Sequence, residues 1–139
     1  MTIKELSQLY YLNREIERDK KRLAELKSKS YSVSGQNLSG LPGGGSFEGS
    51  SIERYVAEIV DLEAIISAKI TQCLHERNRL ERYIADIPDS LTRQIFTLRF
   101  INGFTWVQVA YHIGGYNTMD SVKKICYRYL ERENEKERG

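Results

Sequence analysis

The chain has 139 residues, 40% of them hydrophobic, and its 21 basic and 19 acidic residues give a formal net charge of +2. This length suits one small globular unit with extended helices, and the nearly balanced charge neither requires nor excludes a nucleic-acid partner. No apolar run approaches the roughly 18 residues that span a bilayer. Cys73 and Cys126 stand far apart, without metal-ligand spacing. We therefore expect a cytoplasmic protein with no cofactor, no metal site and no membrane association.

The N-terminal segment is predicted to be a helix. Thr2 and Glu5 have the spacing of a capping box, and leucine and isoleucine then recur at three- and four-residue steps up to Leu26. The pattern ends in SKSYSVSGQNLSGLPGGGSFEGSS, where serine and glycine dominate. Such a composition buries too little apolar surface to repay ordering, so we predict a flexible linker at residues 28–50.

A second capping signal, Ser50 with Glu53, opens a longer periodic run that ends before Pro88. Neither apolar stripe can remain in water, so residues 1–87 are predicted to form a coiled-coil-like helical hairpin. The two helices can pair within one chain or with the same helices of another chain, because the linker is long enough for either. A homodimer through the hairpin is the expected assembly.

Residues 88–132 are predicted to form a trihelical module, which makes the chain all-α. Asp89 or Ser90 can cap the first helix, which Asn102 and Gly103 stop. The second and third helices are expected at residues 106–113 and from about Thr118 onward. The charged end ERENEKERG offers no apolar face, and residues 133–139 are predicted to be a frayed tail.

The last helix has a polar face suited to a DNA groove. At about 100° per residue, placing Val122 and Cys126 inward turns Lys124 and Tyr127 outward. Lysine and arginine can neutralise phosphates or read guanine, and the free N–H groups at Thr105 can clamp a phosphate. The predicted DNA-binding residues are Thr105, Trp106, Gln108, Asn117, Thr118, Asp120, Ser121, Lys123, Lys124, Tyr127 and Arg128.

The run LTRQIFTLRFINGFTWVQVAYHIGG, continued by SVKKICYRYL, resembles region 4 of sigma-70-type factors, a helix-turn-helix. More loosely, the whole chain resembles the prophage-encoded late transcription regulators of the ArpU and RinA type. The resemblance implies a transcriptional regulator that binds double-stranded DNA and uses the hairpin to dimerise or to contact RNA polymerase.

The chain departs from the sigma region 4 pattern in two ways. Twelve positions separate Ala110 from Val122, so the turn GGYNT is longer than usual, and no segment resembles the sigma region that melts promoter DNA.

Two other functions remain open from the sequence. One is a DNA-packaging subunit of the small-terminase type, which assembles as a ring. The other is an adaptor that binds proteins and not DNA. No nucleophile–base arrangement stands out, so we do not expect an enzyme.

Overall fold

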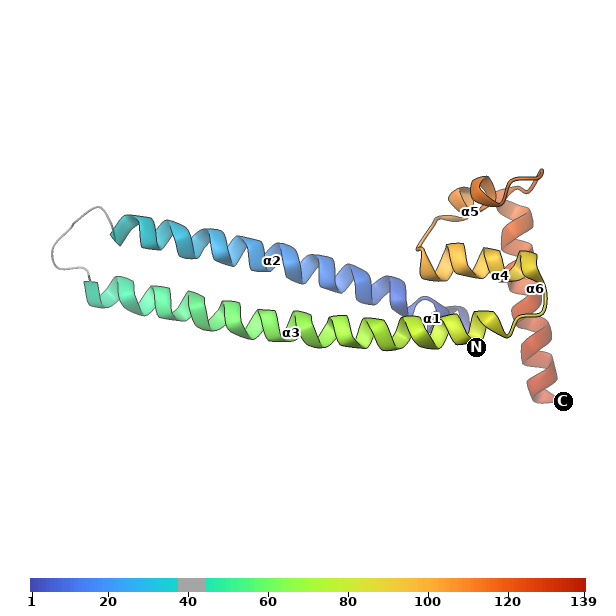
Figure 1. The fold of residues 1–139 in the computed structure, drawn as a ribbon, viewed down its shortest axis with the longest axis horizontal. Coiled ribbons are helices and arrows are strands. Elements are labelled where there is room, and N and C mark those ends of the chain that lie inside the picture. Colours follow the sequence, from blue (N-terminus) through green and yellow to red (C-terminus); the bar gives the residue numbers. More distant parts are fainter. Residues whose placement is uncertain (38–44) are drawn as a thin grey trace. The chain divides into compact units, whose positions relative to one another are not determined.

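The computed structural model describes the backbone of residues 1–37 and 45–139 and the side chains of residues 1–32 and 51–139. Every regular element in this part of the chain is a helix, which confirms the predicted all-α class (Figure 1). The elements are α1 (Ile3–Leu6), α2 (Gln8–Asn37), α3 (Gly45–Ala85), α4 (Ser90–Phe96), the π-helix η1 (Thr97–Ile101), α5 (Trp106–Ile113) and α6 (Met119–Arg138). None of the helices described is both long and apolar enough to cross a bilayer.

The chain divides into two compact units, Asn13–Gln72 and a second one made of Met1–Leu12 with Cys73–Gly139. In the first unit, α2 and α3 run antiparallel and side by side (Figure 1). They bury a small apolar cluster of Leu26, Leu62 and Ile66, and Lys69 bridges from α3 to Asp19 on α2 with an N–O distance of 2.5 Å. The hairpin therefore closes within one chain.

The linker prediction for residues 28–50 is wrong at both ends. The helix α2 continues through the serines to Asn37, and α3 begins at Gly45, before the predicted cap at Ser50. Residues 38–44 lie outside the described residues. A helix that has already formed gains one hydrogen bond for each added residue, and serine is only moderately unfavourable in a helix. The seven residues between the helices are also a usual length for a helical hairpin, so the argument from a long linker for exchange between chains no longer holds.

The second unit contains the main core. The sides of α4, α5 and α6 that face each other supply most of it, and the ends of α2 and α3 contribute Leu9 and Ile84. Its buried members are Leu6, Leu9, Leu80, Ile84, Ile87, Ile95, Phe96, Phe100, Val109, Ala110, Val122, Cys126 and Leu130. The unit thus differs from the predicted division at residue 87, because the N-terminus and the end of α3 share one core with the C-terminal helices.

Local signals in the sequence correctly placed the starts of α1 and α4. Thr2 forms the predicted capping box, and Asp89 caps α4 by accepting the N–H of Thr92 at 3.0 Å. The helix α4 continues directly into η1, where the N–H of Asn102 donates to the carbonyl of Thr97, five residues earlier, at 3.0 Å. The sequence predicted one uninterrupted helix there and did not indicate a π-helix.

The prediction of a frayed tail at residues 133–139 is wrong, because α6 remains helical to Arg138. Within this stretch, opposite charges recur three residues apart, as in Glu133 and Lys136, a spacing that stabilises helices. The hydroxyl of Tyr83 also donates to the Glu133 carboxylate, which ties the helix to the end of α3. Basic residues in the last turn further suit the negative end of the helix dipole.

Candidate nucleic-acid interface

The helix α5 starts at a reciprocal pair of hydrogen bonds. The Thr105 hydroxyl accepts the N–H of Gln108 at 3.2 Å, and the Gln108 amide oxygen accepts the N–H of Thr105 at 2.9 Å. Val109 and Ala110 are buried, which fixes the face that α5 turns to the core. The opposite face is open to solvent and carries Tyr111, whose side chain is 83% exposed.

A five-residue turn, residues 114–118, connects α5 to α6. Its first three residues, Gly114, Gly115 and Tyr116, have positive φ angles of 68°, 59° and 67°. The side-chain amide of Asn117 donates to the Gly114 carbonyl at 2.9 Å, and its backbone N–H donates to the same oxygen at 3.2 Å. The turn is therefore held in one conformation by hydrogen bonds within itself.

A second reciprocal cap starts α6. The Thr118 hydroxyl accepts the N–H of Ser121 at 3.1 Å, and the Ser121 hydroxyl accepts the N–H of Thr118 at 2.9 Å. From there, Val122, Cys126 and Leu130 are buried at intervals of four residues. This register leaves an exposed face on α6, made by Asp120, Lys124, Tyr127 and Arg128, with Lys123 half-buried beside it.

The eleven residues predicted to bind DNA fall into two groups. Five of them use their side chains to build the caps and the turn, namely Thr105, Gln108, Asn117, Thr118 and Ser121. The other six are the exposed face of α6, Lys123 and the half-buried Trp106. Threonine and serine suit helix caps for the same reason that they suit phosphates, since a short hydroxyl side chain accepts or donates close to the backbone. Residue type alone could not separate the two uses.

Sequence reasoning missed Arg99, which joins the helices of the site. Its half-buried guanidinium lies over the Trp106 ring, 4.7 Å from the centroid, and donates to the Phe104 carbonyl at 2.8 Å. The Trp106 ring lies 6.3 Å from that of Tyr127, over which the Lys123 ammonium lies at 6.0 Å. A row of cation–π and ring contacts thus runs from η1 through α5 to α6. The only signal for this row in the sequence was the basic residue Arg99 among apolar neighbours.

The region from η1 to α6 carries a net positive charge. Residues 97–130 contain four of the 21 basic residues and one of the 19 acidic residues, a net charge of +3. The rest of the chain has 17 basic and 18 acidic residues, a net charge of −1. Residues 97–130 are therefore a basic segment, as is the shorter stretch of residues 18–29 on α2, which has six basic and two acidic residues, and a basic segment attracts polyanions.

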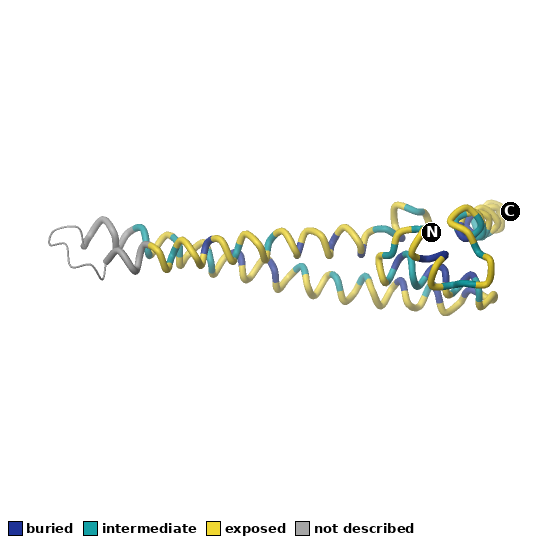
Figure 2. Tube along the Cα trace, turned by 90° about the horizontal axis from the view of Figure 1, so that it is seen from above, coloured by how far each residue is buried: buried dark blue, intermediate teal, exposed yellow. Residues whose placement is uncertain are grey.

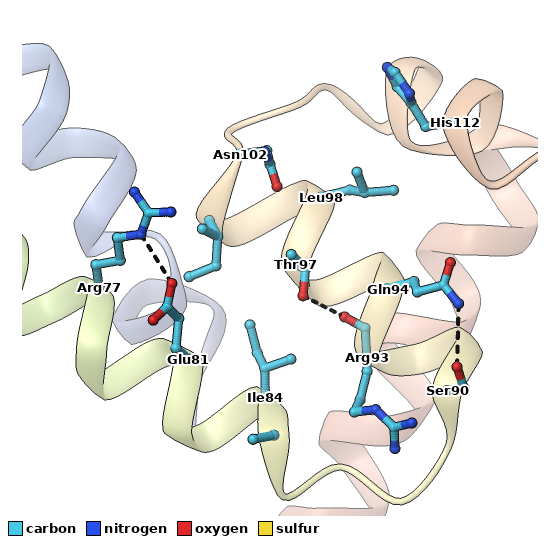
Figure 3. Close-up of a pocket in the computed structure, with 12 residues that line it drawn as sticks. Arg77, Glu81, Ile84, Ser90, Arg93, Gln94, Thr97, Leu98, Asn102 and His112 are labelled. Carbon is cyan, nitrogen blue, oxygen red and sulfur yellow. Dashed lines mark hydrogen bonds and ion pairs between the residues drawn. The ribbon is translucent and has the colours of Figure 1, made fainter.

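A cavity of about 630 Å³ opens beside this region, between α3, α4 and η1 (Figure 3). Its polar residues largely bond to one another. The Arg77 guanidinium pairs with Glu81 at 3.1 Å, and the Gln94 amide donates to the Ser90 hydroxyl at 3.3 Å. Among the described residues, no group of three or more His, Cys, Asp or Glu side chains is placed to hold a metal ion.

No family model, curated protein or solved structure matches the chain.

Proposed function

We propose that this protein is a DNA-binding transcriptional regulator that inserts α6 into the major groove of duplex DNA. The observation that carries the proposal is the exposed face of α6, where Lys124, Tyr127 and Arg128 project from a segment of net charge +3. The major groove, about 12 Å wide, admits an α-helix. The order of a short capped helix, a turn and a longer basic helix is that of a helix-turn-helix, and it supports the likeness to sigma region 4.

In this proposal the charged side chains of the exposed face contact the DNA directly. Lys124 and Arg128 neutralise phosphates or donate to guanine, and Asp120 accepts from the amino group of cytosine. The N–H groups of Thr105 and Gln108 already donate within the cap, so the N-terminus of α5 directs its remaining N–H groups at a phosphate. Thr118 and Ser121 act by fixing where α6 starts, and hence which residues of α6 reach the bases.

We further propose that the hairpin unit pairs two chains through a face of α3 that carries no charge. Between residues 56 and 71, seven exposed residues lie within about 120° of one another on α3 at 100° per residue. They are Val56, Ala57, Val60, Ala64, Ser67, Ala68 and Thr71. The seam between α2 and α3 is already filled within one chain, so a second chain has to use an outer face. Figure 2 shows that exposed residues cover most of this unit.

Val60 and Ile65 provide a matched test of the dimer. Both are apolar and exposed, at 57% and 48%, but Ile65 lies on another side of α3. We expect Val60→Glu to convert a dimer to a monomer in analytical ultracentrifugation, while Ile65→Glu leaves the dimer intact. A monomeric wild-type chain would refute the pairing, and a ring would instead favour the DNA-packaging function.

Fluorescence anisotropy with duplex DNA, titrated across salt concentrations, tests the regulator. We expect the double variant Lys124→Ala, Arg128→Ala to weaken binding and to reduce the slope of log affinity against log salt by about two. The double variant Arg54→Ala, Arg82→Ala removes the same charge from exposed positions on α3, outside both basic segments, and should retain the wild-type slope. Unchanged binding by the folded α6 variant would refute the assigned face. If the wild-type chain binds no DNA even at low salt, an adaptor that binds only proteins becomes the better function.

A further inference from the structure

Tyr116, in the turn before α6, has features that the fold of the chain does not account for. Its side chain is fully exposed, with a relative exposure of 105%, so it packs against no part of the core. It is also the one residue other than glycine with a positive φ among the residues that the structure describes. A bulky L-residue is rarely found in this region of backbone space, because its Cβ crowds the neighbouring carbonyl oxygen.

The turn cannot easily relax this strain. Two positive-φ glycines precede Tyr116, and Asn117 on its other side is fixed by two hydrogen bonds to the Gly114 carbonyl. Glycine or asparagine would adopt the same backbone at lower cost. The chain thus carries a large aromatic side chain where it is unfavourable for the backbone and gains no packing. Such strain is characteristic of residues that contact something outside the fold.

The surroundings of Tyr116 indicate what that contact is. Tyr116 stands two residues before the N-cap of α6 and within the segment of net charge +3. Other exposed apolar side chains come from the same helix–turn–helix stretch, including Tyr111 and Met119. A polyanion that meets the basic face of α6 would pass this turn. The positive charge around Tyr116 therefore favours a polyanion over a protein as the partner.

We propose that Tyr116 is a further DNA contact, in which the ring packs against deoxyribose and the hydroxyl donates to a phosphate beside the groove that α6 enters. The inference rests on the proposed function and adds a residue outside the eleven predicted from the sequence. The contact is uncharged, so it releases no counterions and contributes equally at every salt concentration. It touches the backbone and not base edges, so it strengthens binding to any duplex sequence.

The variant Tyr116→Gly tests the contact without endangering the fold. Glycine suits the positive φ, and this relief offsets the greater entropy that glycine gives to the unfolded chain. We expect a melting temperature close to that of the wild type. In the anisotropy titration we expect about fivefold weaker binding at each salt concentration, with an unchanged slope against log salt. Tyr31→Ala is the matched control, since Tyr31 is 78% exposed on α2, in the other unit, and its loss should leave the affinity unchanged.

The outcomes separate this inference from the function on which it rests. Wild-type affinity in a folded Tyr116→Gly variant overturns the contact while the regulator stands. Weaker binding of Tyr31→Ala by the same factor also overturns it, because the loss would then not be specific to the turn. A wild-type chain that binds no duplex at low salt overturns the regulator itself and the Tyr116 contact with it.

Discussion

The guanidinium of Arg99 lies over the Trp106 ring at 4.7 Å and at the same time donates to the carbonyl of Phe104. One side chain from η1 therefore holds both the loop that leads to α5 and the first residue of α5. The planar guanidinium makes this possible, because it stacks through its face and donates through its edge.

We predict that Arg99→Lys destabilises the second unit by about 1 kcal/mol, since lysine keeps the charge but can neither stack in the same way nor reach the carbonyl in the same geometry. Arg99→Met should cost roughly 1–2 kcal/mol, because the Phe104 carbonyl also loses its donor. Urea denaturation followed by tryptophan fluorescence measures both, with Trp106 as the sole tryptophan. Arg132→Lys, at an exposed position on α6, is the control and should be neutral. Equal stability of Arg99→Lys and the wild type would contradict the assigned role.

The Asp89 cap gives the protein a distinct acid sensitivity. The Thr92 hydroxyl and N–H both donate to the Asp89 carboxylate, and these bonds lower its pKa below the ordinary value of 3.8. A carboxyl whose folded pKa is depressed stabilises the fold above its ordinary pKa, and this contribution is lost as the pH falls through the folded pKa. We expect Asp89→Ala to destabilise the fold at neutral pH and to do so progressively less below pH 3.8.

Asp89→Asn is the matched variant for this cap, because asparagine also caps helices but does not titrate. Its stability relative to Asp89→Ala should stay constant with pH, as measured by urea denaturation between pH 2 and pH 7. A difference between wild type and Asp89→Ala that does not change over this interval would rule out the carboxylate as the source.

Thr118 and Ser121 should behave as one energetic unit, because each hydroxyl accepts the backbone N–H of the other residue. We predict that replacing either residue with alanine lowers the free energy of unfolding by about 1 kcal/mol. The effect of the double variant should differ clearly from the sum of the two single effects. A double-mutant cycle in urea measures the coupling. Strict additivity would show that the two bonds act independently.

The two cysteines should differ in reactivity toward a thiol reagent. Burial raises the pKa of both thiols above 9.0, but Cys126 is buried and its pKa reaches about 12, whereas Cys73 is only partly buried. In the native protein we expect one thiol to react quickly and the other only at the rate at which the second unit opens. Cys73→Ser should remove the fast phase. A Cys126 that reacts before the unit opens would contradict its burial.

The raised pKa of Cys126 should also make the protein less stable at high pH. A thiol whose folded pKa is raised favours the folded state fully below its ordinary pKa of 9.0, and this contribution is lost as the pH rises from there toward about 12. The free energy of unfolding of wild type relative to Cys126→Ala should therefore be constant up to pH 9.0 and decrease above it. If the stability of wild type relative to Cys126→Ala is the same at pH 11 as at pH 9.0, the thiol does not contribute.

Signals in the sequence predicted what is decided locally. Caps at Thr2, Asp89 and Thr105 depend on neighbours within three residues, and the buried side of α6 follows from its 3.6-residue period. The serines near Ser30 were misread, because composition does not reveal that a helix already under way continues at little cost. Periodicity likewise marks Leu6 as buried without showing that its partners lie in the C-terminal helices.

The candidate site was predictable to a similar extent. Periodicity indicated that Lys124 and Tyr127 face outward, as the structure shows. It could not show that Asn117 is engaged within its own turn, or that Tyr116 has a positive φ, because both depend on how the glycine pair folds the chain back. Arg99 was missed since its contacts are made across three elements and no local pattern records them.

The π-helix η1 has a consequence for how this region can change in evolution. A π-helical turn holds one residue more than an α-helical turn, so Thr97–Ile101 acts as a single-residue insertion in the helix that α4 begins. Removing one residue there would restore α-helical phase and rotate everything that follows by about 100°. The direction in which α5 and α6 face is thus set by one residue upstream of both, and a single deletion could redirect the exposed face of α6 without altering any side chain on it.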